Sequence, residues 1–277
     1  MVNPKEKVLL TEEQETLLIP LYSKATESRR PNAIFADEKA QEILAHVDYD
    51  FARLKTPRKT VVTLCIRASK LDAYTREFLG EHPGGVVLHL GCGLDSRCLR
   101  VGHEQAEWYD LDLPPVIDLR RKFYPETGNY HLIPSSVTDL QWVDGIPAGG
   151  RPVLVIAEGL LMYLQEADIK ALLLKLQAAF PGCRLAADVF SKMTAERVSA
   201  HPSLKQTGAT IHWGIDDARD IERWSPGIRL IEEWYFSQAP EIAKLDTGYR
   251  LAFKLAGLFS VANKAQRIVY YELGAGG

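Results

Sequence analysis

Residues 86–97 read VVLHLGCGLDSR, and this stretch decides the fold class. An apolar run long enough for a buried strand ends directly in Gly91-Cys92-Gly93. Glycines at such a point let the backbone turn sharply and approach a ligand without a Cβ in the way. Ligands of open α/β sheets bind at the carboxyl ends of the strands. The stretch predicts a strand-to-helix turn at a ligand site, and a tight turn without a ligand is the plainer alternative.

The glycine pattern is not that of a dinucleotide-binding fold. Ser96 stands where the third glycine of GxGxxG would lie. A pyrophosphate needs close backbone approach at a free helix N-terminus, whereas a ligand without phosphate is less demanding. An NAD-linked oxidoreductase would also need a catalytic Tyr/Lys or His pair, and the sequence contains no YxxxK. These two observations argue against that enzyme class.

The chain after residue 83 alternates between short apolar runs and helical patterns. Such alternation predicts an α/β fold with a mostly parallel sheet that is covered on both faces. VLVIA at 153–157 is apolar throughout, which is typical of a buried central strand. The expected strands cover residues 86–90, 107–110, 130–133, 153–157, 184–189, 228–236 and 267–271, and the expected helices cover 115–123, 166–180, 192–200 and 241–258.

The chain before residue 83 has helical spacing instead. Helices are expected over 36–47 and 57–79, and Pro20 is expected to kink or break an earlier one. At the other end, the last segment is long enough for a helix followed by an edge strand. We expect one domain with four parts: a helical cap or lid over 1–82, a ligand-binding core over 83–190, a substrate-side insertion over 191–227, and a C-terminal part over 228–277 that completes the sheet.

Composition excludes several classes of protein. The 277 residues include 33 Lys and Arg and 36 Asp and Glu, so the net charge is −3 and gives no electrostatic footprint for nucleic acid. Apolar runs reach only about six to eight residues, far short of the ~20 that span a bilayer. Residues 1–15 lack the apolar segment of a signal peptide. We therefore expect a cytoplasmic protein with neither nucleic acid nor a membrane as partner.

The cysteines and histidines argue against metal and disulfide chemistry. The four cysteines Cys65, Cys92, Cys98 and Cys183 have no paired spacing, and we expect reduced thiols. The seven histidines form no HExxH or HxH cluster, so we expect no metal site.

Acidic residues follow two of the expected strands. Asp110 and Asp112 stand at the end of the second strand, where a carboxylate could accept hydrogen bonds from both hydroxyls of a ribose. Alternation does not decide which of the two faces the ligand. Glu158 follows strand 153–157 directly and could hold an ammonium group at the same edge of the sheet. The plain alternatives are a solvated acidic turn and an acid at a helix start.

LHLGCGLDSR, YDLDLPPVIDLRRK and AEGLLMYL, in this order and spacing, resemble the leucine carboxyl methyltransferase family. LYSKATESRRPNAIFAD and HWGIDDARDIERWSPGIRLIEEW resemble its bacterial branch of tetracenomycin-type polyketide O-methyltransferases. The resemblance implies the class I methyltransferase fold, which is Rossmann-like with seven strands, the last antiparallel. It also implies S-adenosylmethionine as methyl donor, S-adenosylhomocysteine as product and a small-molecule acceptor.

The resemblance also implies roles for particular residues. Gly91, Cys92 and Gly93 line the cofactor pocket, Asp112 with Leu113 meets the ribose, Arg67 clamps the methionine carboxylate, and Glu158 meets the amino group. Where relatives often have an Asp-Leu pair near the adenine, this chain has Ser136-Val137, so Ser136 could accept from the adenine amino group, or Asp139 could have taken over that role. Tyr22, Met162, Tyr163 and Trp213 are the candidates for the acceptor surface, although ordinary packing is an equal alternative for each.

The reaction and the acceptor stay open at this stage. A carboxylate acceptor is already ionised at pH 7, whereas a phenol would gain from a general base. A protein C-terminal carboxylate as acceptor and a non-catalytic, methyltransferase-like binding protein are the alternatives. The oligomeric state cannot be read from the sequence. No catalytic residue is assigned, and the weak candidates are His212 and Tyr163.

We expect that no dedicated base acts. The variant His212→Ala should then keep more than a tenth of the wild-type kcat, because alignment of the reactants supplies most of the acceleration. Steady-state kinetics with a turned-over acceptor measure this. A loss of about 10³ would show instead that His212 is a general base.

Overall fold

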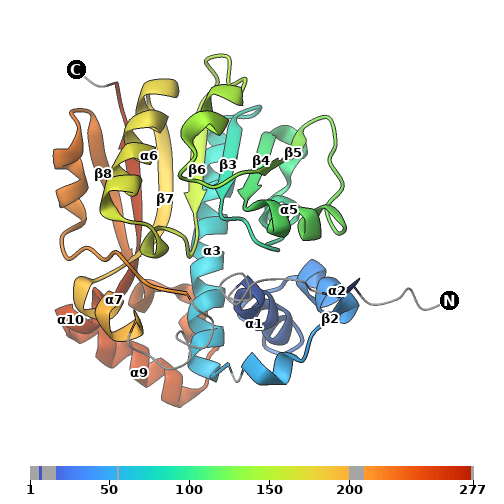
Figure 1. Ribbon diagram of the computed structural model, residues 1–277. Coiled ribbons are helices and arrows are strands. Elements are labelled where there is room, and N and C mark those ends of the chain that lie inside the picture. Colours follow the sequence, from blue (N-terminus) through green and yellow to red (C-terminus); the bar gives the residue numbers. More distant parts are fainter. Residues whose placement is uncertain (1–5, 8–16, 55, 200–208, 276–277) are drawn as a thin grey trace.

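The computed structural model describes residues 6–7, 17–54, 56–199 and 209–275. A seven-stranded sheet forms its centre, with strand order β5-β4-β3-β6-β7-β9-β8 (Figure 1). The strands are β3 (Val86–Leu90), β4 (Glu107–Asp112), β5 (Tyr130–Pro134), β6 (Val153–Ala157), β7 (Cys183–Phe190), β8 (Ile228–Tyr235) and β9 (Gln266–Leu273). Strands β3 to β7 pair in parallel, and β9 runs antiparallel to both β7 and β8. This is the class I methyltransferase sheet.

Helices connect and cover these strands. The helices are α1 (Leu18–Ser28), α2 (Glu38–His46), α3 (Arg58–Glu81), α4 (Arg97–Val101), α5 (Pro114–Arg121), α6 (Glu166–Ala179), α7 (Lys192–Ser199), α9 (Thr247–Leu258) and α10 (Ser260–Asn263). A small parallel pair, β1 (Glu6–Lys7) and β2 (Val47–Asp48), lies beside the N-terminal helices. Each of the seven expected strands of the sheet is present, and the expected helices at 36–47, 57–79, 115–123, 166–180 and 192–200 correspond to α2, α3, α5, α6 and α7.

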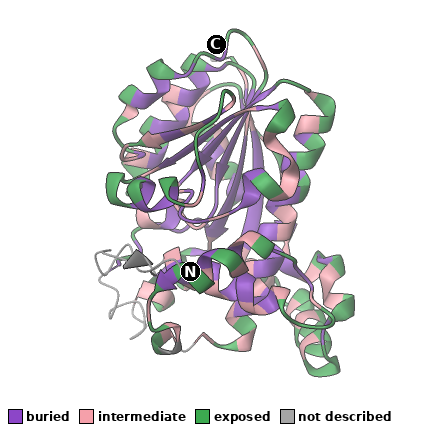
Figure 2. Ribbon diagram, turned by 90° about the vertical axis from the view of Figure 1, so that its right-hand side faces the viewer, coloured by how far each residue is buried: buried purple, intermediate pink, exposed green. Residues whose placement is uncertain are grey.

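Two apolar cores lie on the two faces of the sheet. All five residues of β3 are buried; Val87 belongs to the core under α3, while Val86, Leu88 and Leu90 belong to the core under α6. Figure 2 shows buried residues throughout the sheet and on the inner sides of its helices. A strand buried on both faces has no need for polar residues at alternate positions, which explains why four of the five residues of β3 are apolar.

Three local expectations were wrong. Pro20 does not kink a helix, because it lies in the first turn of α1, which begins at Leu18. Backbone N–H groups in the first turn have no acceptor within the helix, so a proline there removes no hydrogen bond. Strand β9 is not an edge strand: it lies between β7 and β8, and β8 forms the edge. The helix expected over 241–258 is two elements, a 3₁₀ turn Pro240–Lys244 and α9, separated at Leu245.

Several helices gather at one end of the sheet. Figure 1 shows α1 and α2 together with α7, α9 and α10 at the end where the parallel strands finish. Helices α9 and α10 belong to residues 236–265, which join the antiparallel strands β8 and β9. A connection of this length is far beyond the two to five residues of a common hairpin loop. Within the described residues, none of the helices combines the length and the apolar character needed to cross a bilayer.

The core under α3 contains a fully buried charged pair. Asp110 of β4 accepts hydrogen bonds from Arg120, Tyr130 and the indole N–H of Trp108, the last at 2.8 Å. Arg120 also donates to the backbone carbonyls of Gly93 and Asp95, at 2.9 and 2.8 Å. Burial by itself would raise the pKa of Asp110, but the charge of Arg120 and the hydrogen bonds of His89 and Tyr130 lower it well below its ordinary value. Through Arg120, the buried Asp110–Arg120 pair therefore holds the glycine turn after β3 in place.

Removing Asp110 should destabilise the fold strongly. In Asp110→Ala the Arg120 charge stays buried without its partner, which costs about 3–5 kcal/mol of unfolding free energy. In the wild type the stabilisation is complete above about pH 4, the ordinary pKa of a free aspartate, and is lost as the pH falls below that value. Urea denaturation measures both effects. The control Asp118→Ala removes a surface pair with Arg121 and should change stability by less than about 1 kcal/mol; equal losses in the two variants would contradict this account.

Candidate active site

A cavity of about 1330 Å³ opens at the carboxyl ends of the parallel strands. A cavity for one drug-sized ligand has roughly 300–1,000 Å³, so this one has room for two molecules side by side. Its wall includes all nine residues named for the cofactor, which are Arg67, Gly91, Cys92, Gly93, Asp112, Leu113, Ser136, Val137 and Glu158. The structure therefore brings together residues from four strand ends and from α3.

The turn after β3 forms the floor of the cavity. Gly91 and Gly93 both have positive φ, at 62° and 51°, a region that side chains rarely adopt. A Cβ on Gly91 would also lie 3.0 Å from the Leu160 side chain. The Cys92 amide donates to the Leu111 carbonyl at 3.1 Å, which ties the turn to β4. Burial raises the pKa of the Cys92 thiol well above its ordinary value, so this sulfur is a neutral wall atom and not a nucleophile.

The structure separates the roles of the two aspartates after β4. Asp110 is fully buried in the core, whereas Asp112 lines the cavity. The two carboxylate oxygens of Asp112 accept from the amides of Gly93 and Leu113, each at 2.8 Å. A carboxylate has about four acceptor sites, so both oxygens can still accept from a diol. Burial raises the pKa of Asp112, and the two amides oppose that shift.

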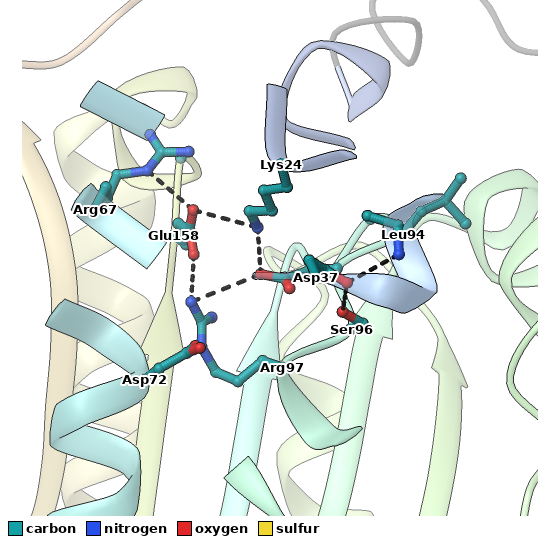
Figure 3. A network of polar contacts seen from close by, with 12 residues as sticks. Lys24, Asp37, Arg67, Asp72, Leu94, Ser96, Arg97 and Glu158 are labelled. Carbon is teal, nitrogen blue, oxygen red and sulfur yellow. Dashed lines mark hydrogen bonds and ion pairs between the residues drawn. The ribbon is translucent and has the colours of Figure 1, made fainter. Parts of the chain in front are cut away.

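Glu158 lies at the centre of a buried network of charges, which Figure 3 shows. Its carboxylate contacts Arg67 at 3.1 Å, Lys24 at 3.8 Å and, at hydrogen-bond distance, Arg97. Lys24 of α1 also contacts Asp95 at 2.8 Å. Burial alone would raise the pKa of Glu158, but these three cations lower it well below its ordinary value. The carboxylate is therefore ionised at neutral pH and can hold a cation.

Arg67 is held in place from the opposite side by Asp188. Asp188, fully buried near the end of β7, accepts from Arg67 at 2.9 Å, from the Gly159 amide at 2.6 Å and from Gln266 at 3.0 Å. Gly159 has a φ of 64°, and a Cβ there would lie 3.1 Å from the Arg67 guanidinium. Arg67 thus lies against a backbone that only glycine permits. Glu158 and Asp188 each use one of the five N–H donors of the guanidinium.

Several members of this network were missed in the sequence. Asp95 and Arg97 belong to the quoted stretch VVLHLGCGLDSR, in which only Gly91, Cys92 and Gly93 received a role. Arg97 pairs with Asp72 at 2.8 Å, and Arg100 contacts Asp95 at 2.7 Å. The available signal was a charged residue within an apolar strand, as at Asp188 in RLAADVF. Its partners come from residues up to about 120 positions away, which no local pattern reveals.

The segment after β5 lies at another side of the cavity. Ser136 and Val137 line the wall, and the Ser136 hydroxyl is 2.8 Å from that of Thr138. Asp139 is exposed and instead accepts from the Gln141 amide at 3.3 Å at the start of a 3₁₀ turn. Of the two candidates for the adenine contact, only Ser136 faces the cavity.

The residues named for the acceptor surface fall into two groups. Met162, Tyr163 and His212 line the cavity, and both the His212 and Trp213 amides donate to the Met162 carbonyl. Trp213 and Tyr22 are not among the lining residues: the Trp213 indole donates to Glu166 at 3.2 Å, and Tyr22 stacks on Phe51 with ring centroids 5.8 Å apart. Burial raises the pKa of Tyr163, and nearby Arg67 opposes that shift.

A further wall of the cavity comes from the connection between β8 and β9. It contributes side chains that are mostly apolar or small, namely Phe236, Ser237, Phe253, Ala256, Ala262, Asn263 and Ala265. The acceptor pocket was expected to be built from the N-terminal helices and residues 191–224, and not from this connection. The segment 236–265 was missed because its sequence shows only that a helix is present, not where that helix packs. Residues 200–208 of the expected insertion lie outside the described part of the chain.

Among the residues that the structure describes, no group of three or more His, Cys, Asp or Glu side chains is arranged to hold a metal ion. The four cysteines are free and buried. Burial raises the pKa of Cys65, Cys98 and Cys183 to about 12, so these thiols are protonated at neutral pH.

Comparison with known proteins identifies the family. The model of the leucine carboxyl methyltransferase family matches residues 18–177, more than half of the chain. The chain belongs to this family. It is 41% identical over 239 residues to the tetracenomycin polyketide synthesis O-methyltransferase TcmP of Streptomyces glaucescens, covering 86% of this chain and 88% of that protein. The chain is therefore an S-adenosylmethionine-dependent methyltransferase of the bacterial branch that its sequence resembles.

A further relative supports this assignment, and a solved structure shares the fold. The S-adenosyl-L-methionine-dependent methyltransferase dpfgK of Gibberella zeae is 31% identical over 254 residues, covering 83% of this chain and 85% of its own. Among solved structures, a duf574 family protein from Streptomyces avermitilis aligns with a TM-score of 0.61 at 13% identity, covering 95% of this chain and 98% of that one. At that identity the structural likeness shows the fold alone.

The position of Arg67 should depend on Asp188. Asp188→Asn removes the charge of the hydrogen bond while keeping the side-chain shape, and a charge-assisted bond contributes about 1.5–3 kcal/mol. The Kd for S-adenosylhomocysteine should therefore rise tenfold or more in calorimetry. Asp144→Asn, at a surface pair with Lys175, should leave Kd unchanged. A folded Asp188→Asn protein with wild-type affinity would show that Asp188 does not position the arginine.

Proposed function

We propose that this methyltransferase transfers the methyl group of S-adenosylmethionine to a carboxylate or hydroxyl oxygen of a small, polyketide-like or aromatic molecule. The observation that carries the proposal is the pairing of Arg67 with Glu158 at 3.1 Å in the cavity wall. A guanidinium and a carboxylate side by side complement the carboxylate and ammonium of an amino acid. The methionine part of the cofactor is such a zwitterion.

The other predicted residues fit the rest of the cofactor. Asp112 would accept from the ribose hydroxyls with the acceptor sites that the two amides leave open. Leu113 and Val137 offer apolar surface and Ser136 a hydrogen-bond acceptor for the adenine end. Gly91, Cys92 and Gly93 would let the backbone approach between these two ends. Each contact is neutral or acidic, as suits a cofactor that carries no phosphate.

S-adenosylmethionine supplies a methyl group on a positively charged sulfur, and the protein has to bring an electron-rich oxygen into line with it. Positioning of this kind removes a large share of the activation barrier when both reactants are held at contact distance. Met162, Tyr163 and His212 line the same cavity as the Arg67–Glu158 pair. They would orient the acceptor and exclude water. A carboxylate acceptor needs no base, and the proposed chemistry assigns none.

Two cations favour an acidic acceptor. Lys59 and Arg197 line the cavity and have no carboxylate partner among the described residues, whereas Lys24 and Arg67 are each paired. An anionic acceptor would compensate both charges. Its apolar body would contact Phe236, Phe253 and Ile211. These positions do not belong to a recognisable sequence motif, and the sequence therefore does not identify the acceptor.

We further propose that residues 1–82 act as a cap on the cavity, that 83–190 hold the cofactor, that 191–227 face the acceptor and that 228–277 complete the sheet. Support for the cap comes from Lys24, whose ammonium reaches Asp95 and Glu158 from α1. The four protonated, unpaired thiols fit a reducing compartment, which supports a cytoplasmic location.

Calorimetry tests the cofactor. We expect micromolar binding of S-adenosylmethionine and S-adenosylhomocysteine and none of NAD. Asp112→Ala should weaken S-adenosylhomocysteine at least tenfold, about 1.4 kcal/mol, because the ribose contact is lost. Asp139→Ala should bind as the wild type does, since Asp139 faces solvent. Failure to bind either sulfur compound at millimolar concentration would overturn the proposal and leave a non-catalytic binding protein.

A further inference from the structure

An unusual apolar surface lies on the outer side of α9 and α10. Nine large apolar side chains are exposed among the described residues, and five of them fall within residues 251–261. These five are Leu251, Leu255, Leu258, Phe259 and Val261, and their exposed fractions are 55, 48, 72, 65 and 63%. We call them the α9–α10 patch. Single exposed leucines are common, but a group of exposed apolar side chains is typical of a surface that binds another protein or a membrane.

The α9–α10 patch is bordered by positive charge. Arg250 and Lys254 lie on α9 one turn apart, and Lys264 follows α10. None of these three side chains has a carboxylate partner among the described residues, and no acidic residue occurs from 247 to 271. Leucine and phenylalanine on one face with lysine and arginine beside them are typical of helices that lie in the interface of an anionic membrane.

We propose that the α9–α10 patch docks this protein on an anionic lipid surface. Leu258, Phe259 and Val261, at the junction of the two helices, are its most exposed members, and a deformable lipid interface can receive them without a matching groove. A second copy of the chain fits poorly. A two-fold contact would bury this face on both copies, and no acidic residue between 247 and 271 could pair with Arg250 and Lys254 across it.

The α9–α10 patch lies on helices whose other side lines the cavity. Phe253 and Ala256 of α9 and Ala262 of α10 line the cavity, while Leu251, Leu255 and Leu258 face solvent. One layer of helix, about 10 Å thick, therefore separates the cavity from the docked surface. An apolar molecule dissolved in the lipid would meet the cavity wall at this place. The expectation of no membrane partner rested on the lack of a spanning segment, and an interfacial helix needs none.

Vesicle flotation of the full chain tests the docking. The protein should float with vesicles of phosphatidylglycerol and phosphatidylcholine at low ionic strength, and not with phosphatidylcholine alone. Neutralising Lys254 as Lys254→Gln should weaken partition about fivefold, since one cation near an anionic surface contributes ~1 kcal/mol. The double variant Leu258→Ser/Phe259→Ser should abolish flotation. Leu255→Ser should weaken it, whereas the matched control Leu99→Ser, on α4 with 47% exposure, should not.

Three results would overturn the proposal. The first is a wild-type protein that floats with neither vesicle. The second is a Leu258→Ser/Phe259→Ser variant that floats as the wild type does. The third is a wild-type dimer in light scattering that becomes a monomer in that double variant, which would assign the patch to self-association. S-adenosylhomocysteine affinity, measured on every variant, should stay at the wild-type value because these residues lie outside the cofactor contacts. Loss of lipid binding with intact affinity thus separates this proposal from the proposed function.

Discussion

The ion pairs around Glu158 are the contacts on which the rest of the site depends. Glu158 follows β6, Arg67 comes from α3, Arg97 from α4, and Lys24 from α1. Each of these charges is costly to bury by itself, and burial is tolerated only because every charge has a partner of opposite sign. The network therefore holds four segments in one arrangement. It also leaves a guanidinium and a carboxylate adjacent in the cavity wall, the pair that a zwitterionic ligand requires.

The same requirement explains why the N-terminal helices cannot be regarded as an addition to a finished sheet. Lys24 compensates Asp95 and Glu158, and Asp37 contacts Arg100 at 2.8 Å. Without α1, Asp95 and Glu158 would lose the Lys24 cation, and without the start of α2, Arg100 would lose one of its carboxylate partners. The N-terminal helices and the sheet thus form one electrostatic unit, although their sequences have different periodicities.

The sequence predicts the sheet better than it predicts what surrounds the cavity. Strands such as VLVIA are specified by local pattern, because a strand buried on both faces must be apolar, and all seven were located. Gly91, Gly93 and Asp112 were expected at a ligand site and line the cavity, since backbone geometry and strand ends leave local signals. Asp188 and Arg97 were not, because their roles arise from partners distant in sequence. Trp213 was misleading for a similar reason: its neighbour His212 lines the cavity, and alternation turns the indole toward Glu166.

The antiparallel strand β9 has a consequence for how this family can diversify. Strands β8 and β9 are paired along their length, from Ile228 with Leu273 to Tyr235 with Arg267, so their register does not depend on the segment that joins them. That segment, residues 236–265, can change in length or composition while every strand keeps its place. The residues proposed to hold the cofactor lie elsewhere, on α3 and at the ends of β3, β4, β5 and β6. Evolution can therefore replace this wall of the cavity as an exchangeable module, without altering the residues proposed to hold the methyl donor.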